Sequence, residues 1–255
     1  MILGIAGLAL TLLAGVLIGA TGIGGVLLVP ILNGVEGLSL SDAIAASALA
    51  FAFPGALAIW RLRRSSVPAH AQGDALALWL MLGALPGAML GAAWVHHADT
   101  KVLLGLLALV ALFSGGRGLM KRPVASQASW TISRRLAIFL GAVVGLGSGL
   151  TGTGGPVLLM PLLMALRQPL LGTIRSAQVI QLPVAMSATL AHAQAGAMPL
   201  TLVPLSVVLG LCLVSGFVVG QRSAERVATR HLQSFVNLLL IAVGLWFLWR
   251  TVSAV

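Results

Sequence analysis

The chain has 255 residues, of which 59% are hydrophobic and only 8% are charged. These proportions exclude an ordinary soluble domain and indicate a polytopic membrane protein. The net charge of +10 could suit nucleic acid, but the basic residues lie mostly in short loops without clustered aromatic side chains, which excludes a nucleic-acid surface.

The first half of the chain predicts four membrane segments. Each is an apolar run able to cross about 30 Å of hydrocarbon. The first run, 2–32, is broken at residues 21–25 by a cluster of glycines. The others are residues 42–60, 75–95 and 102–119. The third carries Gly83, Gly87 and Gly91 at a four-residue spacing, which lets helix backbones approach closely.

The second half repeats this series. Its segments are residues 136–166, broken at 151–155, then 174–192, 200–220 and 232–249. Matching positions include Thr21 with Thr151, Pro54 with Pro183, Gly87 with Gly216, Gly91 with Gly220 and Gly115 with Gly244. We therefore predict a first repeat over 1–120, a cytoplasmic linker over 121–135 and a second repeat over 136–255.

Loop charges predict how the two repeats are oriented, because Lys and Arg collect on the cytoplasmic side of a membrane. The basic loops follow the second, fourth and seventh segments, at 42–60, 102–119 and 200–220, and the last of these loops would lie on the other side if all eight segments crossed fully. The three loops share a side if segments 1 and 5 enter and leave on the same face. The fold class is therefore an all-α polytopic membrane protein with about eight segments in two inverted four-segment repeats, of which segments 1 and 5 are re-entrant. Arg250 then sits on the outer side, where the charge rule does not expect it.

The two glycine breaks predict a shared ligand site. A broken helix frees backbone N–H groups that lipid cannot satisfy, so it must face protein or a wet cavity. Half-helix N-termini that meet near the midplane favour an anion. The candidate substrate-binding residues of the breaks are Thr21, Gly22, Gly24, Gly25, Thr151, Gly152, Thr153, Gly154 and Gly155. The alternative is that these glycines serve only helix packing.

Segment 6, residues 174–192, carries a second group of polar residues. Arg175, Gln178 and Gln181 recur every three residues and so share one helical face, which could hold an oxyanion. Alternatively, Arg175 reaches the headgroups and the glutamines join helices. His192 lies on the same face and is either a proton carrier or, with few partners in view, structural. Ser47 holds the equivalent place in the first half, unless it bonds back to its own helix.

The sequence lacks the residues that cation transport, a disulfide, a cysteine metal site or a dinucleotide site would need. All five acidic residues lie in loops or at segment ends, which disfavours cation transport. The single Cys212 excludes an intrachain disulfide and argues against a cysteine metal site. Gly147 to Gly152 fits Gly-x-Gly-x-x-Gly without the strand or acidic residue that a dinucleotide site requires. We predict no catalytic residue, metal or cofactor.

The duplicated Gly-x-Gly-Gly-(x)-Val-Leu-Leu-x-Pro breaks resemble those of the TauE/SafE family, also called sulfite exporter or DUF81 proteins. The resemblance covers residues 21–30 and 45–49 in the first half and residues 151–161 and 174–183 in the second. It implies a transporter with two related halves that moves sulfur-containing anions across the bacterial inner (plasma) membrane.

The leading hypothesis is therefore a secondary transporter of sulfite, thiosulfate or organosulfonates, embedded in the lipid bilayer and without nucleic acid. Its alternatives are a non-transporting membrane assembly or anchoring subunit and an intramembrane hydrolase that uses Ser148 with His192. The sequence leaves the substrate, the direction of transport, the coupling ion and the oligomeric state open.

Overall fold

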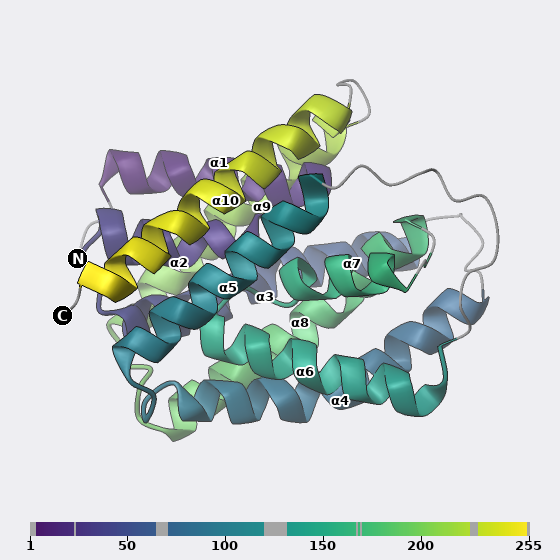
Figure 1. The fold of residues 1–255 in the computed structure, drawn as a ribbon, viewed down its shortest axis with the longest axis horizontal. Helices are drawn as coiled ribbons and strands as arrows, with labels where there is room; N and C mark the ends of the chain where they lie inside the picture. The colour runs from purple at the N-terminus through teal and green to yellow at the C-terminus, as the bar shows by residue number, and fades with distance from the viewer. Residues whose placement is uncertain are drawn as a thin grey trace.

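The computed structural model describes residues 4–22, 24–64, 71–119, 132–166, 168, 170–224 and 229–253. Throughout this part of the chain the regular structure is helical, and no strand occurs in it (Figure 1).

The helices follow the chain in two series. The first series is α1 (Ile5–Thr21), η1 (Gly25–Leu27), α2 (Leu28–Pro30), η2 (Ile31–Val35), α3 (Leu40–Arg64), α4 (Ala71–Trp94) and α5 (Thr100–Leu119). The second series is α6 (Arg134–Thr151), α7 (Pro156–Ala165), α8 (Leu170–Gln194), α9 (Leu202–Ala224) and α10 (Thr229–Ser253). Several helices extend a few residues beyond the apolar runs, because backbone hydrogen bonding continues through polar residues at their ends.

The helices present apolar side chains on the outside as well as in the core. Within the described residues, five helices are long and apolar enough to cross a membrane, namely those at 40–61, 76–94, 100–117, 134–151 and 202–223. Leu90, Leu109 and Phe139 are each 64% exposed, as side chains that face lipid would be. The chain is a multi-pass membrane protein, since water could not solvate such a surface.

Glycines join α4 to α6 through direct backbone contact. A Cβ placed on Gly83, Gly87 or Gly91 would overlap a carbonyl oxygen of α6, and a Cβ on Gly141, Gly145 or Gly149 would overlap one of α4. The close approach predicted from the four-residue spacing is confirmed. We call these six residues the α4–α6 glycine zipper.

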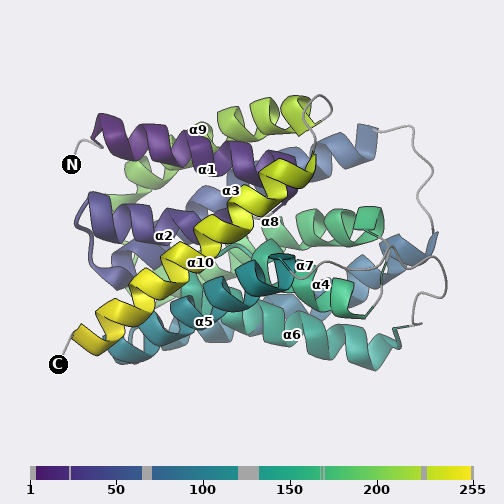
Figure 2. The same ribbon diagram turned by 45° about the horizontal axis from the view of Figure 1, so that its top comes forward.

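The same contact joins α1 to α9. A Cβ on Gly15 would lie 2.5 Å from the carbonyl oxygen of Leu213, and one on Gly19 would overlap that of Phe217. Gly216 and Gly220 of α9 meet the α1 backbone in return. Figure 2 shows α1 beside α9 at one side of the molecule and α4 beside α6 at the other.

Two further helix pairs also pack closely at a glycine, beside the pairs α4–α8 and α3–α9. In the first, α5 packs on α10, where a Cβ on Gly115 would lie 3.1 Å from the Ile241 nitrogen and one on Gly244 would lie 3.0 Å from the Leu112 nitrogen. In the second, α3 packs on α8, where a Cβ on Gly55 would lie 2.8 Å from the Leu182 nitrogen. The pair α3 and α8 holds the centre of the molecule, and the broken segments lie against it.

Candidate functional site

The first break lies between α1 and η1. Gly22 ends α1 in the left-handed region with φ 74°, and its N–H donates to the Ile18 carbonyl at 2.8 Å. Glycine occupies this conformation without steric cost, which is why the helix ends here. The chain restarts as η1, whose Leu27 N–H donates to the Gly24 carbonyl at 3.1 Å. The helix break predicted at 21–25 is present.

The second break lies between α6 and α7. Gly152 ends α6 with φ 63°, and its N–H donates to the Ser148 carbonyl at 2.8 Å. Gly154 and Gly155 also have positive φ, at 77° and 96°. Helix α7 then begins at Pro156, a residue that suits a first helical position because it has no N–H to leave unpaired. The helix break predicted at 151–155 is present too.

The two breaks touch inside the protein. A Cβ on Gly25 would lie 2.5 Å from the Thr153 carbonyl oxygen, and one on Gly22 would lie 2.8 Å from the Met160 sulfur. Gly152 faces Val29 in return, with a Cβ position 3.1 Å from Val29 Cγ2. All of these glycines are buried. The structure thus brings the first break, over 22–25, against the second, over 152–155.

Phe51 of α3 lies against both breaks and was missed by the sequence analysis. A Cβ on Gly25 would be 3.2 Å from Phe51 Cζ, and one on Gly154 would be 3.0 Å from Phe51 Cγ. The side chain is fully buried. An apolar residue inside an apolar segment carries no signal in the sequence, so only the fold identifies it.

Hydroxyl groups gather at the second break. Thr151 Oγ1 donates to the Gly147 carbonyl at 2.6 Å and lies 3.0 Å from Thr153 Oγ1. Ser148 Oγ is buried without a hydrogen-bond partner and lies 3.9 Å from the Cβ position of Gly155. Ser148 drew notice in the sequence only as a possible nucleophile, whereas its position beside Gly155 makes it a candidate ligand donor. The Thr21 backbone forms the last turn of α1, and its side chain lies outside the described part.

The predicted site residues of α3 and α8 differ in their burial and hydrogen bonding. Ser47 Oγ donates to the Ala43 carbonyl of its own helix at 2.6 Å, which is the alternative noted from the sequence. Gln178 is half-buried, whereas Gln181 is 2% exposed and its Oε1 has no partner. The side chain of Arg175 lies outside the described part. Helix α8 packs on α3 and α7, so it borders the second break.

His192 does not pair with Ser148. Its Nδ1 lies 3.0 Å from Nε2 of His96, while Ser148 Oγ has no partner. His96 reaches His192 from the loop after α4, while Nε2 of His192 is buried without a hydrogen-bond partner. The Ser–His dyad that an intramembrane hydrolase would need is therefore not formed in this structure.

The acidic side chains that the structure describes are occupied at helix ends. Glu36 accepts from the Gly4 N–H at 3.2 Å, Asp42 accepts from Ser39 Oγ at 2.6 Å, and Asp99 accepts from the Lys101 N–H at 3.0 Å. None of these three lies at the breaks. The polar atoms that the structure places at the breaks are thus backbone groups and hydroxyls.

Two broken helices that meet inside an all-helical membrane protein are typical of membrane transporters. The family model described as sulfite exporter TauE/SafE matches residues 7–247, nearly the whole chain. The chain therefore belongs to the TauE/SafE sulfite exporter family of membrane transporters. Searches of curated proteins and of solved structures found no match.

Proposed function

We propose that this protein is a secondary transporter of small sulfur-containing anions such as sulfite, thiosulfate or organosulfonates, and that the anion binds where the two glycine breaks meet. The observation that carries the proposal is the contact between the breaks, in which Gly25 lies against the Thr153 carbonyl. The proposal places the protein in a bacterial inner membrane, in keeping with its family.

The chemistry of the breaks favours an anion. Each break precedes the N-terminus of a short helix, where the helix dipole and free N–H groups attract negative charge. Ser148 Oγ is a hydroxyl that has no partner in the protein and can donate to an oxyanion. Gln181 adds a buried amide whose oxygen has no partner. No carboxylate among the described residues lies there to repel the ligand or to favour a cation.

Inverted repeats are part of the proposal, and the helix packing supports them. Exchange of the two halves turns the pair α4–α6 into the pair α9–α1, and both pairs meet through glycines. The same exchange maps α5–α10 and α3–α8 onto themselves. We infer eight segments in repeats 1–120 and 136–255, with α1 and α6 each followed by a returning half-helix. Residues 121–131 of the proposed cytoplasmic linker lie outside the described part.

The alternative of a non-transporting assembly subunit explains the glycine contacts between helices, such as the α4–α6 glycine zipper, better than it explains the breaks. Glycines that serve packing alone sit inside continuous helices, as Gly87 and Gly145 do. Gly152, Gly154 and Gly155 instead have positive φ and lie in the break between α6 and α7. A packing role does not require a broken helix, whereas a broken helix can present its free backbone groups to a ligand.

Phe51 suggests how access to the site is controlled. Its ring packs against Gly25 and Gly154, so the space between the breaks is filled by an apolar side chain. An anion can enter only when the breaks part or the ring turns aside. We infer that Phe51 closes the site in this conformation.

The experiment separates a ligand role from a structural one by measuring flux and stability together. A buried polar group without a hydrogen-bond partner lowers the free energy of unfolding by about 1–3 kcal/mol. Its removal should therefore stabilise the ligand-free protein. We expect Ser148→Ala and Gln181→Leu to keep or raise the unfolding temperature while they lower sulfite or thiosulfate flux in proteoliposomes at least tenfold.

Thr173→Val is the matched control, because Thr173 Oγ1 is also buried without a partner but lies outside the proposed site. This variant should gain stability and keep its flux. Undiminished transport of sulfur anions in both Ser148→Ala and Gln181→Leu would overturn the proposed site. Flux of cations alone in the unmodified protein would overturn the anion assignment.

A further inference from the structure

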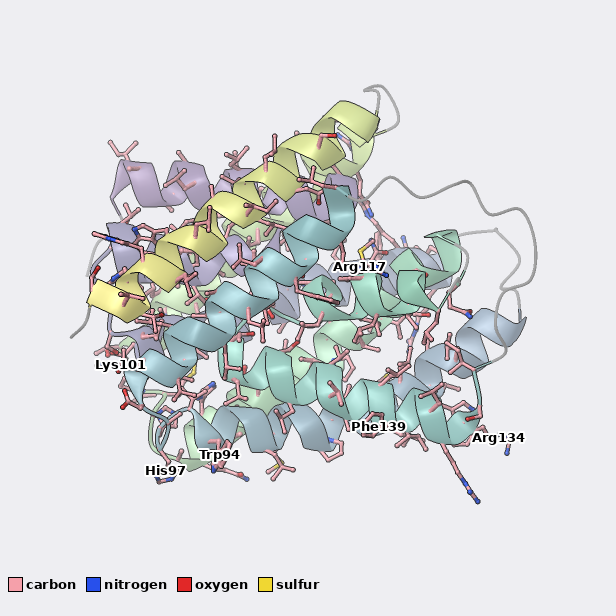
Figure 3. The ribbon with its side chains drawn as sticks, in the orientation of Figure 1. Trp94, His97, Lys101, Arg117, Arg134 and Phe139 are labelled. Carbon is pink, nitrogen blue, oxygen red and sulfur yellow. The ribbon has the colours of Figure 1, made fainter. Side chains whose placement is uncertain are left out.

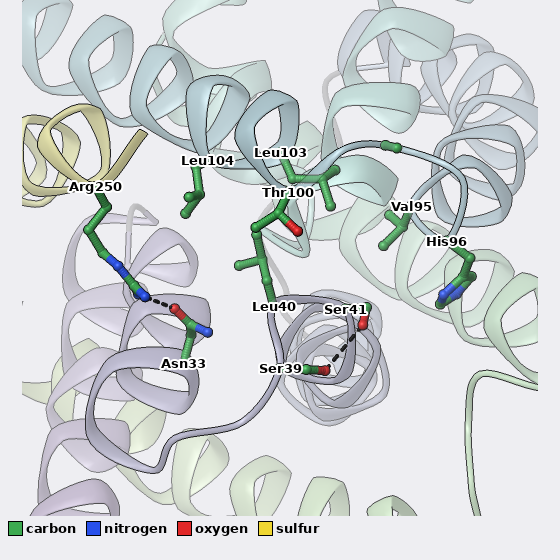
Figure 4. A pocket seen from close by; sticks show the side chains of 11 residues that line it. Asn33, Ser39, Leu40, Ser41, Val95, His96, Thr100, Leu103, Leu104 and Arg250 are labelled. Atoms are coloured by element: carbon green, nitrogen blue, oxygen red, sulfur yellow. Dashed lines mark hydrogen bonds between the residues drawn. The ribbon is translucent and has the colours of Figure 1, made fainter. Parts of the chain in front are cut away.

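A polar cavity of about 330 Å³ lies at one end of the molecule, away from the glycine breaks. Its lining comes from η2, the linker before α3 and the start of α3, and from the loop before α5, the start of α5 and the end of α10 (Figure 4). Its polar lining consists of Asn33, Ser39, Ser41, His96, Thr100 and Arg250. Liquid water occupies about 30 Å³ per molecule, so the cavity has room for a small hydrated ion.

Arg250 is the one charged side chain in this lining. Its Nη1 donates to Asn33 Oδ1 at 2.6 Å, and its guanidinium carbon lies 5.2 Å from the Trp246 ring centroid. A guanidinium carries five N–H donors, of which this hydrogen bond uses one. These contacts fix the side chain toward the cavity and leave donors in the planar arrangement that oxyanions accept.

The carboxylates near this end are turned to other partners. Asp42 accepts from Ser39 Oγ, a hydroxyl of the lining, Asp99 accepts from the Lys101 N–H, and Glu36 accepts from the Gly4 N–H. None of these three lines the cavity. Arg250 therefore faces hydroxyls, an amide and His96, which is the environment of an anion receptor and not of an ion pair.

The position of the cavity indicates which side of the membrane it faces. Figure 3 shows His97 and Lys101 at the end of the molecule opposite Arg134. The loop charges assign the Arg134 end to the cytoplasm and the cavity to the outer face. The charge rule gives no reason for an arginine at the outer end of α10, whereas a role in the cavity does.

We propose that this cavity is a second anion site, an outer vestibule in which Arg250 and the surrounding hydroxyls hold the transported oxyanion on its way to or from the breaks. The proposal rests on the proposed function for the identity of the anion. A free sulfur oxyanion and a lipid phosphate share the chemistry that Arg250 recognises. The free anion is favoured because the guanidinium is bonded to Asn33 inside the cavity.

The test uses the full-length protein and thiosulfate, with two readouts. The first is the shift of unfolding temperature with thiosulfate concentration in detergent. The second is flux in proteoliposomes of uniform orientation, with thiosulfate added on the His97 side. Arg250→Gln removes the charge, Arg250→Lys keeps it without the planar donor array, and Ser41→Asp places a carboxylate in the lining.

Loss of one charge-assisted contact is expected to raise the half-saturating thiosulfate concentration about tenfold in Arg250→Gln. The maximal rate should stay within about twofold, since the breaks are intact. Ser41→Asp should weaken binding at least as much, and Arg250→Lys should recover part of it. Arg222→Gln is the matched control, because it removes an exposed arginine at the other end of the molecule and should change neither readout.

The two proposals fail in different ways. Transport with an unchanged half-saturating concentration in Arg250→Gln and Ser41→Asp would overturn the vestibule and leave the transporter standing. Absence of sulfur-anion flux in the unmodified protein, with a thiosulfate shift that Arg250→Gln abolishes, would overturn the transporter and leave an anion site. A shift with phosphatidylglycerol vesicles but none with thiosulfate would overturn the vestibule in favour of a lipid contact.

Discussion

The imidazoles of His96 and His192 are joined by a hydrogen bond of 3.0 Å between Nε2 of the first and Nδ1 of the second. Their rings meet edge to face, at 83° and 5.2 Å between centroids. His96 belongs to the loop after α4, and His192 to the last turn of α8. The contact therefore ties the end of a helix of the first half to the end of a helix of the second.

This pair predicts lower stability in acid. Burial, followed by the nearby His97, lowers the pKa of His96 below its ordinary value of 6.5, and Asp42 opposes the shift. The unfolded chain then binds a proton before the folded protein does, so this contribution to stability is complete above about pH 6.5 and is lost as the pH falls below it. Protonation of both rings would also break their hydrogen bond, since both nitrogens that form it would then be donors.

The measurement is the unfolding temperature between pH 5 and pH 8. It should fall more steeply below pH 6.5 for the unmodified protein than for His96→Asn, which cannot titrate. His97→Gln is the control, because His97 is exposed and has no part in the bond. Equal pH profiles for all three proteins would contradict the prediction.

The surroundings of two glycines predict that one added methyl group lowers stability at the first and raises it at the second. In Gly145→Ala the new Cβ would overlap the Ala84 carbonyl oxygen, so α4 and α6 must separate. Such overpacking costs about 1–3 kcal/mol. In Gly105→Ala nothing lies within 4 Å of the Cβ position, and the helix gains up to about 1 kcal/mol of propensity. Thermal unfolding of the two variants should move in opposite directions.

The glycine breaks could be predicted from the sequence because their signal is local. Four glycines inside an apolar run weaken a helix wherever the run lies, and Gly22 and Gly152 end their helices as expected. The spacing of Gly83, Gly87 and Gly91 likewise predicts a close helix contact. It does not say which helix makes the contact, since any backbone fits against glycine, and α6 is found there only through the fold.

The candidate site and the outer cavity were only partly visible in the sequence, because their remaining residues depend on contacts between distant segments. Phe51 is one apolar residue among many until the breaks are seen against its ring. His96 and His192 are 96 residues apart, and no pattern links them. Arg250 looked like an exception to the charge rule before the cavity around it was known. Ser47 illustrates the opposite case, since its local bond to Ala43 is one that serines in helices commonly make.

Phe51 should matter more for stability than an aromatic residue that faces lipid. Phe51→Ala removes a buried ring from between the breaks and leaves a cavity, at a cost of about 3–5 kcal/mol. Phe139 is 64% exposed on α6, so Phe139→Ala should cost far less. Chemical unfolding in detergent would compare the two variants. A similar loss in both would show that the Phe51 ring does not hold the breaks together.

The proposed inverted repeats predict which ends of the helices share a side of the membrane. Residue 97 lies in the loop after α4 and residue 253 at the end of α10, on the side that we assign to the outside. Residues 135 and 222 lie at the ends of α6 and α9 that we assign to the cytoplasm. Each is exposed, so a cysteine placed there is open to reagents. The sole native cysteine is removed first by Cys212→Ala, since Cys212 is half-buried in α9.

A membrane-impermeant maleimide applied to intact cells should modify His97→Cys and Ser253→Cys, and should modify Arg135→Cys and Arg222→Cys only after the cells are permeabilised. Arg222 decides between the two topologies. If segments 1 and 5 crossed the membrane completely, the end of α9 would face outward and Arg222→Cys would react in intact cells, whereas re-entrant first segments place it beside Arg135. Labelling of Arg222→Cys without permeabilisation would therefore show that the halves are not inverted. The two glycine breaks would then not enter the membrane from opposite sides to meet at one ligand.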